Sequence, residues 1–435
     1  MKKVIVAIIL FTTLTNLFAQ NNKQIFVTTD IDNFWTAYDK IITTKDSAAQ
    51  YGYLNKLYIE KGSAGLKSIM EVKQYTPKKY IDAINQYPLF WKSIRHNINE
   101  SKNVRGSVQI AINKLKAAYP ALKPIPIYFT VGVFRTNGTA SNNSILIGSE
   151  MALTDKNTII SELPEYLNYF YTRYANSYKT IDLLCVHEYI HSQQKELVQN
   201  LLSASLYEGV AEFVSAKVTG KPSNVPAIVF GNKNEEKVKQ KFEQDMFIPN
   251  RFYDWLWSAG KNSFDVRDLG YYIGYTICER NYAMVKDKKK AIKEMIELDY
   301  TNEAQVEEFV DRTKFFSTSL KILNKNFEKL RPRVIKVSQF ENGSQNVSAD
   351  LTKITLIFSE PMDKNNRGFD FGPLGEPNVL SVKNVIGFSE DGKSFTFEIE
   401  VKPNQRYQTL ITNRFCTTNG IPLKPFLIDI TTLGK

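Results

Sequence analysis

The chain has 435 residues, of which 43% are hydrophobic and 12% aromatic, enough apolar material for two domains with packed cores. Charged residues make up 23%, as on an ordinary globular surface, and the three cysteines are too few for a disulfide framework. The formal net charge of +11 comes from scattered lysines, and the one dense run, at 286–294, has the spacing of a solvated helix face. Nucleic acid is therefore not an expected partner.

The first residues have the layout of a secretory signal peptide, which we predict at 1–19. Lys2 and Lys3 precede a short apolar run that ends at the small residue Ala19, so cleavage is expected after Ala19. An uncleaved anchor is the alternative. No later stretch reaches about 18 apolar residues, which predicts a mature chain without an integral membrane span. The protein is therefore expected to be exported to the periplasm or to the outside of a bacterial cell.

The next elements are expected to be helices around a small sheet. Helical regions show apolar residues three and four positions apart, whereas the strands are short apolar runs bounded by turn residues. The sequence "RTNGTASNN" is interpreted as a turn-rich connection between the strands. The expected elements are helices over about 31–122, strands at 125–134 and 144–149, helices at about 181–199 and at 203–220, and further helices to about 330.

A third region, 332–435, has the pattern of a β-domain. In "SFTFEIEV", apolar residues from Phe395 to Val401 alternate with polar ones, as in a half-buried strand. The segments "ITLIFSEPMD", "KPNQRYQTLITN" and "NGIPLKPFLIDITT" resemble those of bacterial Ig-like domains. The resemblance implies an all-β sandwich that positions or binds rather than catalyses. The whole chain is thus predicted to be α+β, with a mostly helical domain before the sandwich.

The segment "CVHEYIHSQQKEL" carries two of the three histidines of the chain. His187, Glu188 and His191 form the pattern HExxH. Residues four apart lie on one face of a helix, so both imidazoles can bind one metal ion, and neutral imidazole suits Zn²⁺. Glu188 adjoins the first histidine, where it can take a proton from a water molecule at the metal. The pattern predicts a catalytic site with one zinc ion per chain.

The third protein ligand is expected on the next helix. Glu208 and Glu212, in "LYEGVAEF", lie four apart and can both face the metal, and their distances from His191 in the sequence do not decide between them. If one of these glutamates binds the metal, the other can accept a hydrogen bond from a metal-binding histidine. Glu212 without any role in the site is a further alternative.

These motifs resemble those of the gluzincin zinc metallopeptidases of the peptidase MA superfamily. Glu208-Gly209-Val210-Ala211 matches their EGxA element, which implies that Glu208 is the third ligand and leaves Glu212 beside a histidine. The resemblance also implies that an edge strand pairs with extended substrate, for which "FTVGVF" and "SILIGS" are the candidates. A donor to the oxyanion is usual in such peptidases, and Tyr275 is the candidate here.

We therefore expect 20–331 to be a metallopeptidase domain, with a helical part at 20–124 and a catalytic core at 125–331, followed by the Ig-like domain at 332–435. The expected activity is hydrolysis of peptide bonds in a peptide or protein substrate, with Glu188 as general base. One alternative is a periplasmic or cell-surface binding protein on an inactive peptidase scaffold. Another is a zinc hydrolase that cleaves a non-peptide amide.

Overall fold

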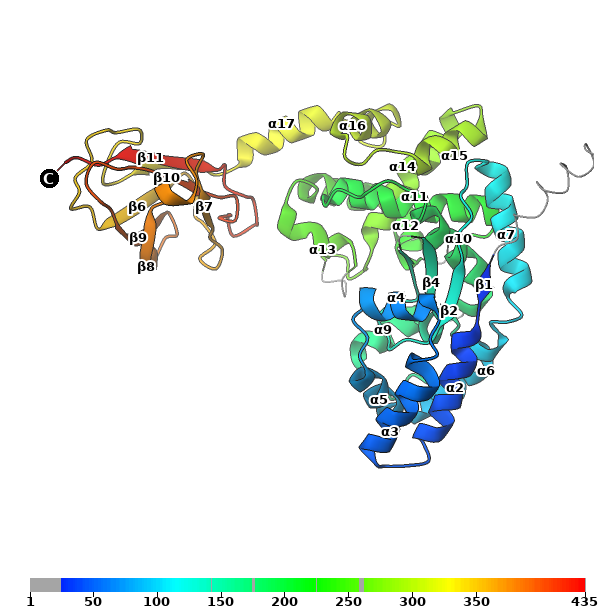
Figure 1. The fold of residues 1–435 in the computed structure, drawn as a ribbon. Coiled ribbons are helices and arrows are strands. Elements are labelled where there is room, and N and C mark those ends of the chain that lie inside the picture. Colours follow the sequence, from blue (N-terminus) through cyan, green and yellow to red (C-terminus); the bar gives the residue numbers. More distant parts are fainter. Residues whose placement is uncertain (1–24, 142, 174–176, 224, 258–261, 435) are drawn as a thin grey trace, which may run out of the picture. The chain divides into compact units, whose positions relative to one another are not determined.

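The computed structural model describes residues 25–434 except 142, 174–176, 224 and 258–261 (Figure 1). The signal peptide predicted at 1–19 lies outside this range. The described residues form two compact units: one from residues up to Val238 together with Leu256–Phe315, and one from Lys239–Trp255 together with the residues from Phe316 onward. The α+β class is confirmed. Within the described residues, no helix has both the length and the apolar character needed to cross a membrane.

The first unit begins with a helical region whose helices have clear local start signals. Asp46, Ser63 and Thr76 each accept a hydrogen bond from a backbone N–H in the first turn of the following helix, as good N-caps do. Buried aromatic side chains such as Phe34 and Trp91 then pack these helices together. The helices are α2 (Thr29–Ile41), α3 (Ser47–Leu54) with a π-helical turn at Asn55–Ile59, α4 (Ala64–Val72), α5 (Pro77–Gln86), α6 (Pro88–Glu100) and α7 (Arg105–Ala118).

A four-stranded sheet follows, in the order β1-β2-β4-β3. β1 and β2 are parallel, β2 and β4 are parallel, and β3 runs antiparallel to β4. The strands are β1 (Phe26–Val27), β2 (Ile127–Thr130), β3 (Gly138–Ser141) and β4 (Ser144–Gly148).

The order of the strands corrects two predictions. The segment 136–141 was expected to be part of a turn-rich connection, but it contains β3, whose residues are small or polar and whose pairing depends on β4. The two strands proposed as substrate-binding edges are also not edges, because β2 lies between β1 and β4, and β4 lies between β2 and β3. The edge on this side of the sheet is β3.

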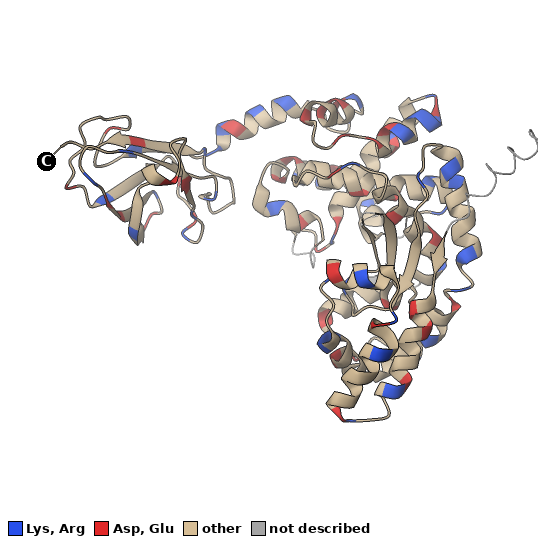
Figure 2. Cartoon of the chain, viewed as in Figure 1, with Lys and Arg blue, Asp and Glu red and all other residues tan. Residues whose placement is uncertain are grey.

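The rest of the first unit is again helical. It contains α8 (Ser149–Ala152), α9 (Glu165–Arg173), a 3₁₀ turn at Ser177–Thr180, α10 (Ile181–His191), α11 (Leu201–Thr219), the start of α12 (Pro226–Asp245), α14 (Leu269–Met284), α15 (Lys288–Ile296) and α16 (Glu303–Arg312). Along these helices, Lys and Arg are interspersed with Asp and Glu (Figure 2).

The helix expected at 181–199 is shorter than predicted and ends at His191. Gln194 donates a hydrogen bond to the backbone oxygen of Tyr207, which holds the chain against α11 instead of letting the helix continue. The next helix begins with Asn200, whose side chain accepts a hydrogen bond from the backbone of Ser203. This helix is closed at Gly220, which adopts a left-handed conformation with φ of 73°.

α11 also packs closely against α14. A Cβ atom on Gly209 would lie 2.2 Å from the backbone carbon of Gly274, and one on Gly274 would lie 1.9 Å from the backbone oxygen of Ser205. Both positions therefore require glycine. Gly209 of the EGxA element thus serves contact with α14, which brings the start of α14 close to α10 and α11.

The second unit contains α13 (Phe252–Trp255), α17 (Leu320–Leu330) and seven strands. The strands form two antiparallel sheets, β11-β10-β7 and β5-β6-β9-β8, and both sheets contribute to one hydrophobic core. The alternation predicted around Phe395 is confirmed, since Phe395, Phe397 and Ile399 are buried in β9. The strands are β5 (Val334–Val337), β6 (Lys353–Phe358), β7 (Phe369–Phe371), β8 (Ser381–Phe388), β9 (Ser394–Glu400), β10 (Arg406–Ile411) and β11 (Phe426–Thr431).

Candidate metal centre

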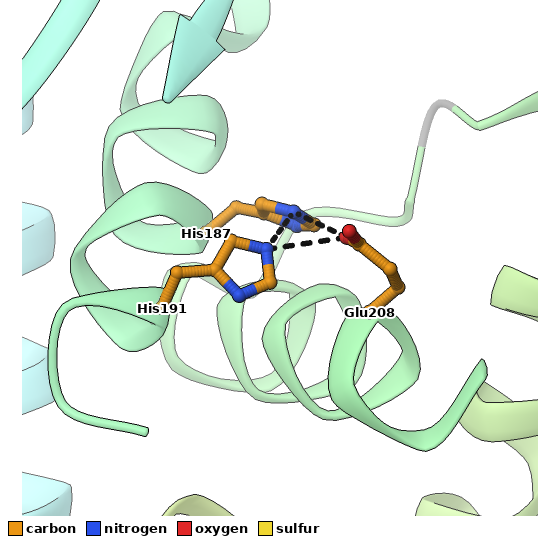
Figure 3. Close-up of side chains that lie close together, drawn as sticks. All are labelled: His187, His191 and Glu208. Atoms are coloured by element: carbon orange, nitrogen blue, oxygen red, sulfur yellow. Dashed lines mark hydrogen bonds and ion pairs between the residues drawn. The ribbon is translucent and has the colours of Figure 1, made fainter. Parts of the chain in front are cut away.

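Two histidines of α10 and a glutamate of α11 meet in the first unit (Figure 3). The Nε2 atoms of His187 and His191 are 3.0 Å apart. The Oε2 atom of Glu208 lies 3.1 Å from Nε2 of His191 and 3.4 Å from Nε2 of His187. The helical spacing of the histidines and the crossing of α10 with α11 therefore place three potential ligand atoms at the corners of a small triangle.

The other nitrogen of each imidazole has an acceptor. Nδ1 of His187 is 3.0 Å from Oε2 of Glu212, and Nδ1 of His191 is 2.7 Å from Oε1 of Gln194. A carboxylate only accepts hydrogen bonds, and so does the amide oxygen, so both Nδ1 atoms act as donors. In the neutral tautomers this leaves both Nε2 atoms with a lone pair that points at Glu208.

This convergence fits a cation. Two imidazole lone pairs and a carboxylate oxygen repel one another unless a proton or a metal ion lies among them. Zinc binds imidazole nitrogen and carboxylate oxygen at roughly 2.0–2.2 Å in tetrahedral sites, which separates two ligand atoms by roughly 3.3–3.6 Å. The observed separations of 3.0–3.4 Å are close to this size. The residues present therefore fit Zn²⁺.

The electrostatics of the triangle favour positive charge. Burial lowers the pKa of His187, but its hydrogen bonds to Glu208 and Glu212 outweigh burial and raise the pKa to about 10. Burial likewise raises the pKa of Glu208, but the two imidazoles outweigh burial and hold the pKa well below its usual range. A proton and a metal ion compete for the same lone pair, so surroundings that hold a proton this firmly also favour a divalent cation.

Aromatic side chains fix the positions of the three groups. The indole N–H of Trp257 donates a hydrogen bond of 3.0 Å to the second carboxylate oxygen of Glu208. The ring of Tyr207 stacks on His191 with a centroid distance of 4.4 Å, and that of Tyr271 stacks on His187 at 6.2 Å. The orientation of each potential ligand is thus set by neighbours on other turns or other elements.

The triangle opens into a cavity of about 590 Å³, lined by parts of β3, α9, α10, α11 and the start of α14. Glu188 faces this cavity beside β3, where a Cβ atom on Gly138 would lie 2.8 Å from its Oε1 atom. Burial raises the pKa of Glu188, although the two histidines oppose this. A carboxylate with a raised pKa is better suited to accept a proton and pass it on.

The structure brings together most of the predicted site residues. His187, His191 and Glu208 form the triangle, Glu188 lines the cavity, and Glu212 contacts His187 as expected of the glutamate that is not a ligand. Tyr275 is not among the residues that line the cavity.

Tyr275 packs its ring on Phe213 at a centroid distance of 5.3 Å. Tyr271, one helical turn earlier on α14, takes the place next to His187. The residue of α14 that lines the cavity beside His187 is therefore Tyr271 and not the predicted Tyr275.

Three other residues of the site were not identified from the sequence. Gln194 lies three positions after His191 and Tyr207 directly precedes Glu208, so their closeness to the motifs was an available signal. Trp257 is 49 positions from Glu208, and no local pattern relates the two.

No family model matches this chain, and neither does any curated protein. Structural similarity extends to bacterial surface layer proteins. Domains 1–6 of surface layer protein SbsC match 65% of this chain with 15% identity and a TM-score of 0.18, and rSbsC(31-844) matches 94% with 14% identity and a TM-score of 0.18. The chain spans less than half of either structure, 44% and 45% respectively. A TM-score of 0.18 is too low to support a conclusion about fold or function.

Proposed function

We propose that this protein is an exported zinc-dependent metallopeptidase of the gluzincin type. The observation that carries the proposal is the convergence of His187, His191 and Glu208, with Glu188 in the same cavity. A structural metal site is closed by protein ligands, whereas three ligands beside a cavity leave a coordination position for water. A binding scaffold would have no need for a buried glutamate at that position.

Each residue then has a defined task. Zn²⁺ bound by His187, His191 and Glu208 supplies Lewis-acid chemistry for water and for the scissile carbonyl group. Glu188 takes a proton from the attacking water and delivers it to the leaving amine, for which its raised pKa is suitable. Glu212 and Gln194 hold the imidazoles in the tautomer that presents Nε2.

The substrate is proposed to bind along β3. This strand pairs with β4 on one side, it is an edge of the sheet, and three of its residues line the cavity. An extended peptide can add to such an edge through backbone hydrogen bonds, which places a peptide bond near Glu188.

Export of the chain and the Ig-like character of 332–435 belong to the same proposal, and rest on the sequence patterns.

The test is hydrolysis of a mixed pool of peptides by the zinc-loaded mature chain, followed by mass spectrometry. We expect defined cleavage products from the native protein. We expect roughly 10²–10⁴-fold slower cleavage by Glu188→Gln, because the general base is lost while the ligands remain. Absence of cleavage by the native protein with its zinc in place would overturn the peptidase proposal in favour of a binding protein or a hydrolase of other amides.

A further inference from the structure

The wall of the cavity beside β3 carries two cations. Lys73 directly follows α4, and Arg135 lies between β2 and β3. Both line the cavity together with Gly138 and Glu188. The helical N-terminal region and the sheet thus each contribute one positive charge to the side along which we propose that the peptide binds.

These two cations differ from most of the other charged groups of the cavity. Arg267 forms an ion pair with Asp268 at 2.5 Å, and Glu208 and Glu212 contact histidines. In the part of the chain that the structure describes, neither Lys73 nor Arg135 forms an ion pair or a side-chain hydrogen bond. Charged groups that line a cavity without a protein partner are available to a ligand.

On this wall, Glu188 is the single carboxylate among the described residues whose charge acts on Lys73, so two cations face one anion. Burial lowers the pKa of Lys73, and the positive charge of Arg135 lowers it further, while Glu188 opposes both effects. Glu188 is a single carboxylate and is required for proton transfer in the proposed mechanism. A second carboxylate between Lys73 and Arg135 would relieve the repulsion between these cations, and both side chains can donate hydrogen bonds to it.

We propose that Lys73 and Arg135 form a subsite for a carboxylate group of the peptide substrate, and that the enzyme prefers acidic peptides. The carboxylate comes either from an Asp or Glu side chain or from a free C-terminus. This inference rests on the proposed function, because it assigns the substrate class of the same cavity. It makes Lys73 and Arg135 the residues that determine specificity.

The experiment measures the affinity of fluorescent peptides by anisotropy. The protein is the zinc-loaded mature chain with Glu188→Gln, so that peptides are not consumed. Three versions of one short peptide pool are compared: a neutral pool with an amidated C-terminus, the same pool with a free C-terminus, and an amidated pool with one Glu in place of Gln. The variant combines Lys73→Met with Arg135→Gln. The matched control combines Lys56→Gln with Lys67→Gln, two exposed lysines of the same helical region.

We expect at least one acidic pool to bind roughly 10-fold more tightly than the neutral pool, as charge-assisted hydrogen bonds provide. In the Lys73/Arg135 variant this ratio should fall towards one, whereas the control should keep it. The pool that shows the preference identifies the source of the carboxylate. Equal affinity for all three pools, a preference that survives in the variant, or a loss of affinity that is equal for acidic and neutral pools would each overturn the inference.

The outcome is separable from that of the proposed function. Zinc content and peptide cleavage are measured on the chain with Glu188 intact. Cleavage without a charge preference leaves the peptidase in place and removes the subsite. A charge preference that depends on Lys73 and Arg135, in a protein that cleaves no peptide, leaves the subsite in place and removes the peptidase.

Discussion

Two buried carboxylates of the first unit, those of Glu208 and Glu150, have surroundings that shift their pKa values in opposite directions. At the crossing of α10 and α11, Glu208 faces two imidazoles, which hold its pKa well below the usual range. Next to the sheet, at the start of α8, Glu150 has only backbone partners, the N–H groups of Gly132 and Phe134. Burial there outweighs the hydrogen bonds and raises the pKa of Glu150 to about 7.

The difference shows what distinguishes a site from a structural contact. Glu150 joins the loop after β2 to α8. Its carboxyl group can accept the two backbone hydrogen bonds both when it is protonated and when it is ionised. Glu208 is kept ionised by two imidazoles whose Nε2 atoms converge on its Oε2 atom. Burial of a charged group alone therefore does not indicate a ligand site. It does so when other potential ligand atoms converge on the same point.

The largest effect is expected for Glu150→Gln, as a change in the pH dependence of stability. The folded state holds the proton of Glu150 more tightly than the unfolded state, so its contribution to stability is fully present below pH 4.5 and declines as the pH rises to about 7. The difference in free energy of unfolding between the native protein and the variant should therefore fall by about 3 kcal/mol between pH 4 and pH 8. Urea unfolding followed by tryptophan fluorescence at several pH values measures it. A difference that is constant with pH would show that folding does not raise the pKa of Glu150.

A second prediction concerns the partner of His187. In Glu212→Gln the amide can still accept a hydrogen bond from Nδ1, but it supplies no negative charge. We expect zinc affinity to fall roughly 10–100-fold, as for other residues that orient a metal-binding histidine. Competition with a zinc-binding dye measures the affinity. Glu279→Gln, an exposed glutamate of α14, is the matched control and should keep the native affinity. An equal affinity for all three proteins would show that the negative charge of Glu212 does not contribute to zinc binding.

The smallest effect is expected for Trp257→Phe. The variant keeps an aromatic ring but loses the N–H that donates to Glu208. Trp257 is 43% exposed, so water can replace this donor, and we expect zinc affinity to fall by less than about 10-fold, which is 1.4 kcal/mol. The same dye competition provides the measurement. A loss larger than that of Glu212→Gln would mean that Trp257, and not Glu212, is the main support of the centre.

The parts of the site that could be predicted from the sequence are those set by helical spacing. His187 and His191 are one turn apart, and their shared face follows from helix geometry alone. The same spacing on the next helix placed Glu208 and Glu212 on one face, whereas the resemblance to the EGxA element made Glu208 the expected ligand and left Glu212 beside a histidine. The α+β class followed from the change of apolar periodicity between the two halves of the chain.

The remainder depends on tertiary contacts that leave no local pattern. β3 has no apolar alternation that would mark it as a strand in the sequence. Its place in the sheet depends on pairing with β4. The choice of Tyr271 over Tyr275 depends on how α14 crosses α11 at Gly274 and Gly209, which turns one tyrosine towards His187 and the other towards Phe213. Such contacts are fixed by side-chain packing across elements that are far apart in the sequence.

The most direct test of the account is the zinc content of the purified mature chain, measured by elemental mass spectrometry beside Glu208→Ala. We predict about one zinc per native chain and a large loss in the variant, because only two of three protein ligands remain. Glu279→Ala should retain the native content. A native chain that holds no zinc even after zinc is added back, or a Glu208→Ala variant that retains it fully, would contradict the assignment of His187, His191 and Glu208 as a zinc site.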